Sequence, residues 1–320
     1  MNFEFSEEQQ MLREQARGFL TEHCSTSVVR AVLDSNEDWD AGLWKKVADM
    51  GWTATVIPEA YGGLGLSYYE LAILAEEMGR SAAPLPFSSS LYLASEAIRH
   101  FGNESQKSEW LPKLASGECV ATVAMAERAG RLVLDQLQTR RTDSQITGHK
   151  VPVADASVAD VAVVLARSDQ GLEACLVPLK QEGVVISPVL TFDTSRGHSA
   201  ITFDRADAQA LGNAPLDPAD WERVIDGAAV LFAWEQLGVA ESALIQARDY
   251  ALQRFAFGRA IGSYQAIKHK LANMYVKNTL ARSNAYYGVW ALAEGSDELP
   301  LAAATARVAA IQASTYAAEE

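Results

Sequence analysis

The chain has 320 residues, a formal net charge of −14, 49% hydrophobic residues and 21% charged residues. This length suits two or three packed units, and the composition is typical of a globular protein. Nucleic-acid binders carry clustered positive charge, so the acidic balance argues against DNA or RNA as a partner.

The cysteines and the N-terminus indicate the setting. Cys24, Cys119 and Cys175 are widely spaced, and the five histidines show no metal-ligand spacing. We therefore expect no disulfide framework, no metal site and a reducing, cytoplasmic environment. The segment Met1–Phe5 shows no secretory signal, and no apolar run approaches the roughly 20 residues of a membrane span.

Residues 1–117 predict an all-α domain. Ser6 followed by Gln9 has the spacing of a helix capping box, and apolar residues then recur at helical spacing. Two further amphipathic stretches follow, at 43–50 and 69–78. Between them lies a loop rich in Pro and Gly, at 58–65.

Residues 118–215 predict an antiparallel β domain, because short runs rich in β-branched residues are separated by Gly, Asp, Ser and Pro. These runs are 120–124, 161–165, 184–186 and 199–203. Residues 216–320 predict a helical bundle, since long stretches without proline carry apolar residues at helical spacing. The expected class is therefore α+β multidomain, and no GxGxxG motif favours a doubly wound sheet.

The turn between the two long C-terminal helices is the most informative segment. Arg254 at a helix end can fork onto phosphate oxygens, and Phe257 can pack on a planar ring. Gly258 permits a tight exit from the helix, and Gln265 can hydrogen-bond a sugar or base edge. From these residue types alone, a polar helix–helix corner and a ligand site remain open.

This turn resembles a known signature. Arg254-x-x-Phe257-Gly258, followed by Ile261 and Tyr264-Gln265, is similar to the segment with which acyl-CoA dehydrogenases bind FAD. Other stretches match that family in the same order over essentially the whole chain: 58–65, 70–80, 102–107, 110–112, 117–118, 148–150 and 156–160.

The resemblance implies α,β-dehydrogenation of an acyl-CoA thioester in lipid or steroid catabolism. A carboxylate removes the α-proton while a hydride passes to flavin N5. The resemblance further implies a tetramer in which Arg254, Phe257, Ile261 and Gln265 reach the FAD of a neighbouring subunit. It implies an electron-transfer flavoprotein as the acceptor.

Two stretches depart from the family pattern in the β domain. Ala126-Glu127-Arg128-Ala129-Gly130-Arg131 replaces Thr-Glu-Pro and a Gly-Ser-Asp turn, so the serine on the CoA side is missing. The backbone near Met125 and Ala126 remains a candidate flavin contact. The segment Pro152-Val153-Ala154 replaces Trp-Ile-Thr, which removes the aromatic ring and the hydroxyl beside the flavin. By position, Val153 and Ala154 stay cofactor-binding candidates.

The catalytic base is not identified. The helix positions that carry a substrate-binding Arg or a Glu base in some members are Ala228 and Ala229 here. Asp226 is a nearby candidate, with a surface carboxylate at a helix start as the alternative. The family's usual C-terminal Glu would follow Glu320, so we expect the C-terminal domain to be incomplete at its end.

Three hypotheses fit these features. The chain is an ordinary acyl-CoA dehydrogenase, forming a homotetramer. Alternatively, it is the non-catalytic subunit of a heterotetramer, completing the FAD site of a paralogous catalytic subunit, as in some bacterial dehydrogenases of steroid side-chain CoA thioesters. The third hypothesis is a non-enzymatic scaffold with the same fold.

Overall fold

The computed structural model describes residues 5–35, 37–130, 132–212 and 215–320. Arg131 and Met1–Glu4, which entered the sequence analysis, lie outside the described residues. The chain divides into two compact units by spatial contact, and neither unit is continuous in sequence. The first contains Met1–Ser27, Ser67–Ala83 and Asp226–Glu320, and the second contains Val28–Leu66 and Pro84–Ile225. The bounds of the three consecutive domains given above stay a prediction.

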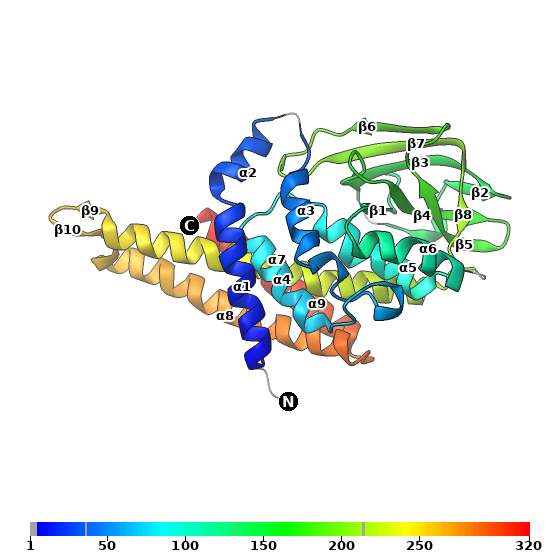
Figure 1. Cartoon of the computed structure of the whole chain (residues 1–320). Helices are drawn as coiled ribbons and strands as arrows, with labels where there is room; N and C mark the ends of the chain where they lie inside the picture. The colour runs from blue at the N-terminus through cyan, green and yellow to red at the C-terminus, as the bar shows by residue number, and fades with distance from the viewer. Residues whose placement is uncertain (1–4, 36, 131, 213–214) are drawn as a thin grey trace. The chain divides into compact units, whose positions relative to one another are not determined.

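The first unit is helical (Figure 1). Its helices are α1 (Glu7–His23), α4 (Tyr68–Arg80), most of α7 (Pro218–Gln253), α8 (Gln265–Ala293) and α9 (Leu299–Glu319). The capping box is confirmed, because the hydroxyl of Ser6 accepts a hydrogen bond from the Gln9 amide and the Gln9 side chain accepts one from the Ser6 amide. Between α7 and α8 lie β9 (Phe255–Ala256), β10 (Arg259–Ala260) and a 3-10 turn, Ile261–Ser263.

Small residues let the helices of this unit approach closely. A Cβ atom added at Gly79 of α4 would lie 1.8 Å from the carbonyl oxygen of Glu235 on α7. One added at Gly238 of α7 would lie 1.9 Å from the carbonyl oxygen of Glu76. The backbones of α4 and α7 are therefore in direct contact. Helices α7 and α8 are joined by a hydrogen bond, which the indole N–H of Trp234 donates to the carbonyl of Ala285 at 3.1 Å.

A buried ion cluster links four helices of the same unit. The carboxylate of Glu76 is 1% exposed and lies 2.7 Å from the guanidinium of Arg282, 3.2 Å from that of Arg13 and 3.6 Å from that of Arg80. Arg282 also pairs with Glu241 at 2.6 Å. Burial by itself raises the pKa of Glu76, but the surrounding guanidinium groups outweigh it and hold the pKa below its ordinary value. The cluster therefore stays charged at neutral pH.

The second unit is built on a sheet with strand order β6-β7-β3-β2-β4-β5-β8, with β1 paired to β4. The strands are β1 (Ala121–Ala124), β2 (Arg140–Thr142), β3 (Gln145–Ala154), β4 (Val161–Ser168), β5 (Gly171–Pro178), β6 (Val184–Pro188), β7 (His198–Asp207) and β8 (Gln209–Ala210). The sheet is largely antiparallel, as predicted, while β1 and β2 pair with β4 in parallel.

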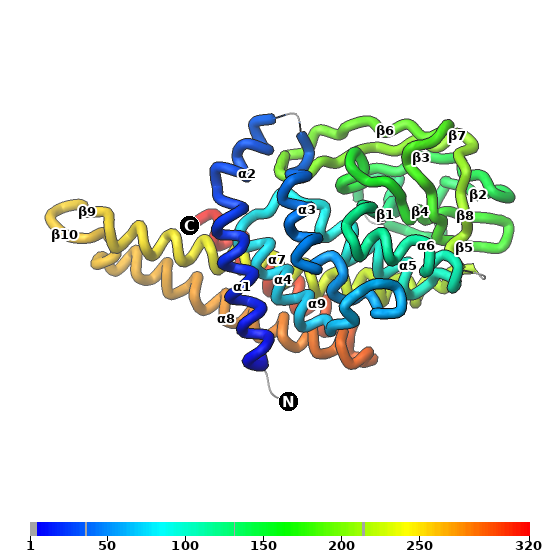
Figure 2. Tube along the Cα trace, viewed as in Figure 1, coloured from blue at the N-terminus to red at the C-terminus, as the bar shows by residue number. Residues whose placement is uncertain are grey.

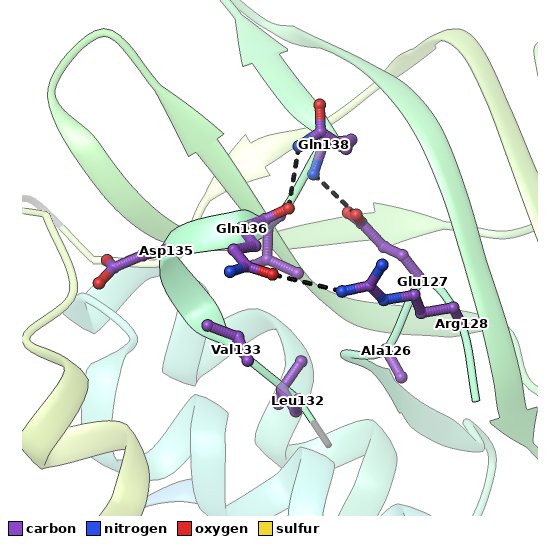
Figure 3. Close-up of a pocket in the computed structure, with 9 residues that line it drawn as sticks. Ala126, Glu127, Arg128, Leu132, Val133, Asp135, Gln136 and Gln138 are labelled. Carbon is purple, nitrogen blue, oxygen red and sulfur yellow. Dashed lines mark hydrogen bonds between the residues drawn. The ribbon is translucent and has the colours of Figure 1, made fainter. Parts of the chain in front are cut away.

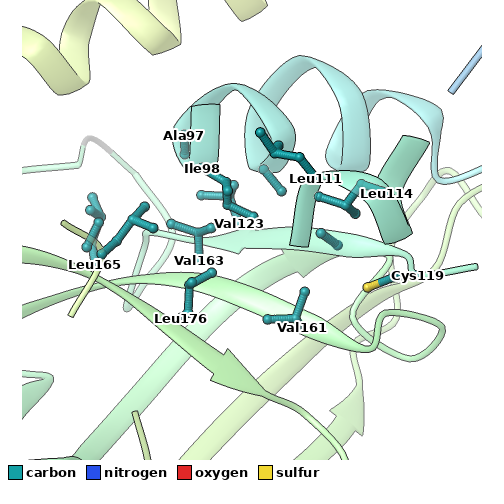
Figure 4. Packing of buried hydrophobic residues seen from close by; sticks show 14 of the residues in the cluster. Ala97, Ile98, Leu111, Leu114, Cys119, Val123, Val161, Val163, Leu165 and Leu176 are labelled. Carbon is teal, nitrogen blue, oxygen red and sulfur yellow. The ribbon is translucent and has the colours of Figure 1, made fainter. Parts of the chain in front are cut away.

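The helical segments of this unit include α3 (Ala41–Asp49), α5 (Glu96–Phe101), α6 (Glu104–Ala115), a π-helix at Ser88–Ser95, and 3-10 turns at Trp52–Ala54, Glu59–Tyr61 and Leu134–Gln136. Of these, α5, α6 and the π-helix contribute buried residues to the cluster that they share with the sheet. Helix α2 (Thr26–Leu33) crosses the boundary between the units. Figure 4 shows Ile98 and Leu111 of the helices facing Val123, Val163 and Leu176 of the strands. All five side chains are buried, so this contact forms the core of the unit.

Membrane and metal features can be assessed for the described ranges. There, one helix, α7, is long and apolar enough by length and composition to cross a membrane, and 44% of its most apolar window is buried. Core helices of globular proteins pass the same test, so the absence of a membrane span stays a prediction. Within those ranges no group of three or more His, Cys, Asp or Glu residues could hold a metal ion.

Candidate functional site

The predicted FAD-binding signature forms a short hairpin between the end of α7 and the start of α8 (Figures 1 and 2). Ala256 pairs with Arg259 in antiparallel register, which leaves Phe257 and Gly258 as the two turn residues. Their φ angles are +52° and +79°, the signs that a type I′ hairpin turn requires. Glycine adopts this conformation readily, whereas an aromatic residue pays a strain cost of about 1–3 kcal/mol.

The hairpin presents its signature side chains to solvent. The side chain of Phe257 is 97% exposed, and Arg254 and Gln265 are also exposed. None of the three side chains makes a hydrogen bond, ion pair or ring contact with another described residue. Ile261 is half-buried, and its amide donates to the carbonyl of Arg254 at 2.8 Å. A residue held in a strained backbone conformation is typical of functional sites, so the turn at Phe257 is a candidate contact for a ligand or partner.

A second group of predicted contacts lies where β1 ends. Met125 and Ala126 are half-buried. The carbonyl of Met125 accepts a hydrogen bond from Lys150 Nζ at 3.0 Å, and the carbonyl of Ala126 accepts one from the Val151 amide at 2.8 Å. Strand β3 therefore fixes the backbone of both candidate residues.

Lys150 and Glu127 form a buried ion pair beside this backbone. Lys150 is fully buried, and its Nζ lies 3.1 Å from Glu127 Oε1. The two Glu127 oxygens accept the amides of Gln138 and Thr139 at 2.7 and 2.8 Å. Burial lowers the pKa of Lys150 to about 8, even though Glu127 opposes the shift. Burial raises the pKa of Glu127, but the amide donors and Lys150 outweigh it and lower that pKa to about 2. Sequence reasoning missed this pair.

A cavity of about 620 Å³ opens next to the ion pair (Figure 3). Its wall includes Ala126, the charged groups Glu127 and Arg128, and the apolar side chain of Leu132. The Arg128 guanidinium donates to Gln136 Oε1 at 3.3 Å across the wall. A volume in this range accommodates part of a small-molecule ligand. The altered stretch that begins at Ala126 thus forms part of the cavity wall.

The segment that replaces Trp-Ile-Thr lies at the end of β3. Val153 is fully buried, whereas Pro152 is exposed and Ala154 is half-buried. Val153 pairs with Ser199 of β7, and alternation along the strand places Pro152 and Ala154 on the opposite face. Hence the side chain of Val153 is not presented to a ligand in this structure. Its cofactor-binding role, like that of Ala154, stays a prediction.

The carboxylates of α7 differ in their surroundings. Asp226 is half-buried, and Ala228 two residues further is buried. Glu241 pairs with Arg282 at 2.6 Å in the ion cluster, and its side chain is 31% exposed. Asp226 stays a candidate base.

Helices, a sheet and further helices, with an exposed Arg-x-x-Phe-Gly hairpin, are what the resemblance to the class of flavin-dependent acyl-CoA dehydrogenases implies. Comparisons with known proteins agree with that class. Residues 6–118 match the model for the acyl-CoA dehydrogenase N-terminal domain, and residues 222–320 match the model for the C-terminal domain. Acyl-CoA dehydrogenase IpdE2 of Mycobacterium tuberculosis is 32% identical to this chain, and the match covers 98% of this chain and 84% of the relative. The chain belongs to the acyl-CoA dehydrogenase family.

Solved structures agree with this assignment. The ChsE4–ChsE5 complex from Mycobacterium tuberculosis superimposes with a TM-score of 0.90 at 26% identity, covering 99% of this chain and 86% of that one. A variant of the Tcur3481–Tcur3483 steroid ACAD superimposes with a TM-score of 0.85 at 29% identity, covering 98% and 87%. The predicted family, the fold class and the assignment to a family of flavin-dependent oxidoreductases are confirmed.

Proposed function

We propose that this chain is a subunit of a FAD-dependent acyl-CoA dehydrogenase whose β9–β10 hairpin completes the FAD site of a partner subunit. The observation that carries the proposal is the state of Arg254, Phe257 and Gln265. All three are exposed, and their side chains make no hydrogen bond, ion pair or ring contact with another described residue. The hairpin therefore keeps its binding capacity for a group outside the chain.

The residues of the hairpin suit the diphosphate and adenosine half of FAD. The guanidinium of Arg254 offers paired N–H donors to phosphate oxygens, and the ring of Phe257 offers an apolar face to a planar ring system. Gln265, at the first position of α8, offers an amide to a sugar or base edge. The guanidinium, the aromatic ring and the amide therefore fit this half of FAD.

The segment of this chain that corresponds to the flavin-ring contacts of the family has fewer groups that could bind flavin. Pro152 has no aromatic face or N–H, and Ala154 has no hydroxyl, so neither can replace the side chains that line the flavin in typical members. Bound FAD supplies the hydride acceptor of the family reaction. A partner that retains the aromatic residue, the hydroxyl and a carboxylate base would supply what this chain lacks.

A paralogous subunit is the partner that fits best. Two of the similar structures carry two component names each, ChsE4–ChsE5 and Tcur3481–Tcur3483, and the latter is called a steroid ACAD. These names support a heterotetramer that acts on an acyl-CoA substrate in lipid or steroid catabolism. An electron-transfer flavoprotein accepts the electrons, and the assembly works in the cytoplasm.

A homotetramer in which each chain also binds its own flavin is the second candidate. The cavity beside Ala126 favours it, because the backbone of Met125 and Ala126 is held in place there. In that arrangement Asp226 is the candidate base. Flavin in the chain purified alone, together with loss of turnover in Asp226→Asn, would support this candidate.

Arg254→Ala tests the proposed role of the hairpin. Loss of charge-assisted hydrogen bonds to phosphate should weaken FAD binding by the assembled flavoprotein about 10- to 100-fold. Arg30→Ala is the matched control, since Arg30 is exposed on α2. Titration of the apo-assembly with FAD measures both constants. Equal affinity in Arg254→Ala and the control would rule out the proposal.

A further inference from the structure

The conformation of the hairpin needs a cause, because two strand residues on each side do not make a stable ribbon. Phe255–Ala256 and Arg259–Ala260 form only two residue pairs, and isolated two-stranded hairpins are marginal in water even when longer. The positive φ of Phe257 adds strain. Contacts outside the ladder must therefore hold the turn.

Tyr264 supplies such contacts from the residue before α8. Its hydroxyl donates to the carbonyl of Ala256 at 2.9 Å, which ties the helix start to strand β9. The guanidinium of Arg259 lies 4.0 Å from the centre of the Tyr264 ring, at cation–π distance. One side chain thus contacts both strands of the hairpin.

Further hydrogen bonds hold the segment that joins the hairpin to α8. The amide of Ile261 donates to the carbonyl of Arg254 at 2.8 Å, and the amide of Tyr264 donates to the carbonyl of Ile261 at 3.1 Å. The hydroxyl of Ser263 donates to the carbonyl of Ala260 at 2.7 Å. The loop from Arg254 to Tyr264 is therefore closed at both ends, and Arg259 is engaged with a ring while Arg254 stays free for an outside ligand.

We propose that Tyr264, with Arg259 on its ring, is a positioning residue that holds the hairpin in the conformation presenting Phe257 and Arg254 to the FAD of a partner subunit. This role rests on the function proposed above. Tyr264 acts through the hairpin and not by touching the reacting atoms. Because only the closed hairpin binds, the apparent dissociation constant rises as the closed fraction falls.

The test compares FAD binding by apo-assemblies that contain this chain. Tyr264→Phe removes only the hydroxyl, and Arg259→Gln removes only the charge on the ring. The loss of one hydrogen bond or one exposed cation–π contact should raise the FAD dissociation constant about 3- to 10-fold. Tyr275→Phe is the control, because Tyr275 is an exposed tyrosine on α8.

Kinetics separate positioning from direct contact. Tyr264→Phe should slow FAD association, since fewer molecules have a closed hairpin, whereas Arg254→Ala should mainly speed dissociation. Hydrogen exchange at the Ile261 amide should also accelerate in Tyr264→Phe, and the melting temperature of the assembly should match the control.

The outcomes distinguish the two proposals. Unchanged FAD binding in Tyr264→Phe and Arg259→Gln, with weakened binding in Arg254→Ala, would overturn the positioning role and leave the proposed function standing. Unchanged binding in all three variants would overturn both. Slower association in Tyr264→Phe and faster dissociation in Arg254→Ala would support both.

Discussion

Neutralising Glu76 should be among the most destabilising single changes in the helical unit. The substitution Glu76→Gln keeps the shape of the side chain but removes the negative charge that faces Arg282, Arg13 and Arg80 at 2.7, 3.2 and 3.6 Å. Breaking a buried pair by removing one partner costs about 3–5 kcal/mol. Glutamine retains a carbonyl oxygen that can still accept hydrogen bonds from a guanidinium, so we expect a loss at the lower end of this range, about 3 kcal/mol.

Thermal and chemical unfolding measure this loss. A cost of about 3 kcal/mol corresponds to a fall in the melting temperature of about 6–12 °C for a unit of this size. Glu14→Gln is the control, since Glu14 is exposed on α1 and its change should stay within about 0.5 kcal/mol.

The pH dependence gives a second check on the same carboxylate. The folded-state pKa of Glu76 lies below its unfolded value, so its contribution is fully present above the unfolded pKa and is lost as the pH falls toward the folded value. The difference between wild type and Glu76→Gln should therefore be largest at neutral pH and shrink below about pH 4. A difference under about 1 kcal/mol at pH 7 would refute the account of the ion cluster.

Two further predictions concern the other buried features. Lys150→Met should cost about 3 kcal/mol at pH 7, and adding Glu127→Gln should restore part of it, as measured by urea unfolding. Because the folded-state pKa of Lys150 is lowered from 10.5 to about 8, wild-type stability should rise relative to Lys150→Met as the pH rises between these values, and a falling difference would contradict the pKa shift. Gly79→Ala should cost about 3 kcal/mol or more because its Cβ would lie 1.8 Å from the carbonyl oxygen of Glu235, whereas Gly18→Ala, with open space at the Cβ position, should stabilise α1 by up to about 1 kcal/mol. Equal melting temperatures for the two glycine variants would contradict the close α4–α7 contact.

The sequence predicts the helices well where the signal is local. The Ser6 cap and the proline-free stretches that become α7 and α8 depend on residues close together in the chain. By contrast, Ser88–Ser95 forms a π-helix, and its three consecutive serines give no helical or strand period to detect. Strand β5, Gly171–Pro178, was also missed.

The candidate site likewise has one part that local sequence predicts and one part that depends on the tertiary structure. The family signature from Arg254 to Gln265 is contiguous, so its residues are found by pattern alone. Its exposure depends on the hairpin geometry, which no local pattern contains. The pair Lys150–Glu127 joins residues 23 positions apart through the arrangement of strands, and only the structure brings them together.

Flavin content tests the central claim most directly. The chain is purified alone and also together with a paralogous subunit that retains the Trp-Ile-Thr stretch, and the visible spectrum of each sample is recorded. A site completed across subunits predicts no flavin band in the chain alone and a substrate-bleachable flavin band in the co-purified assembly. A stoichiometric flavin band in the chain alone, bleached by an acyl-CoA, would contradict the account.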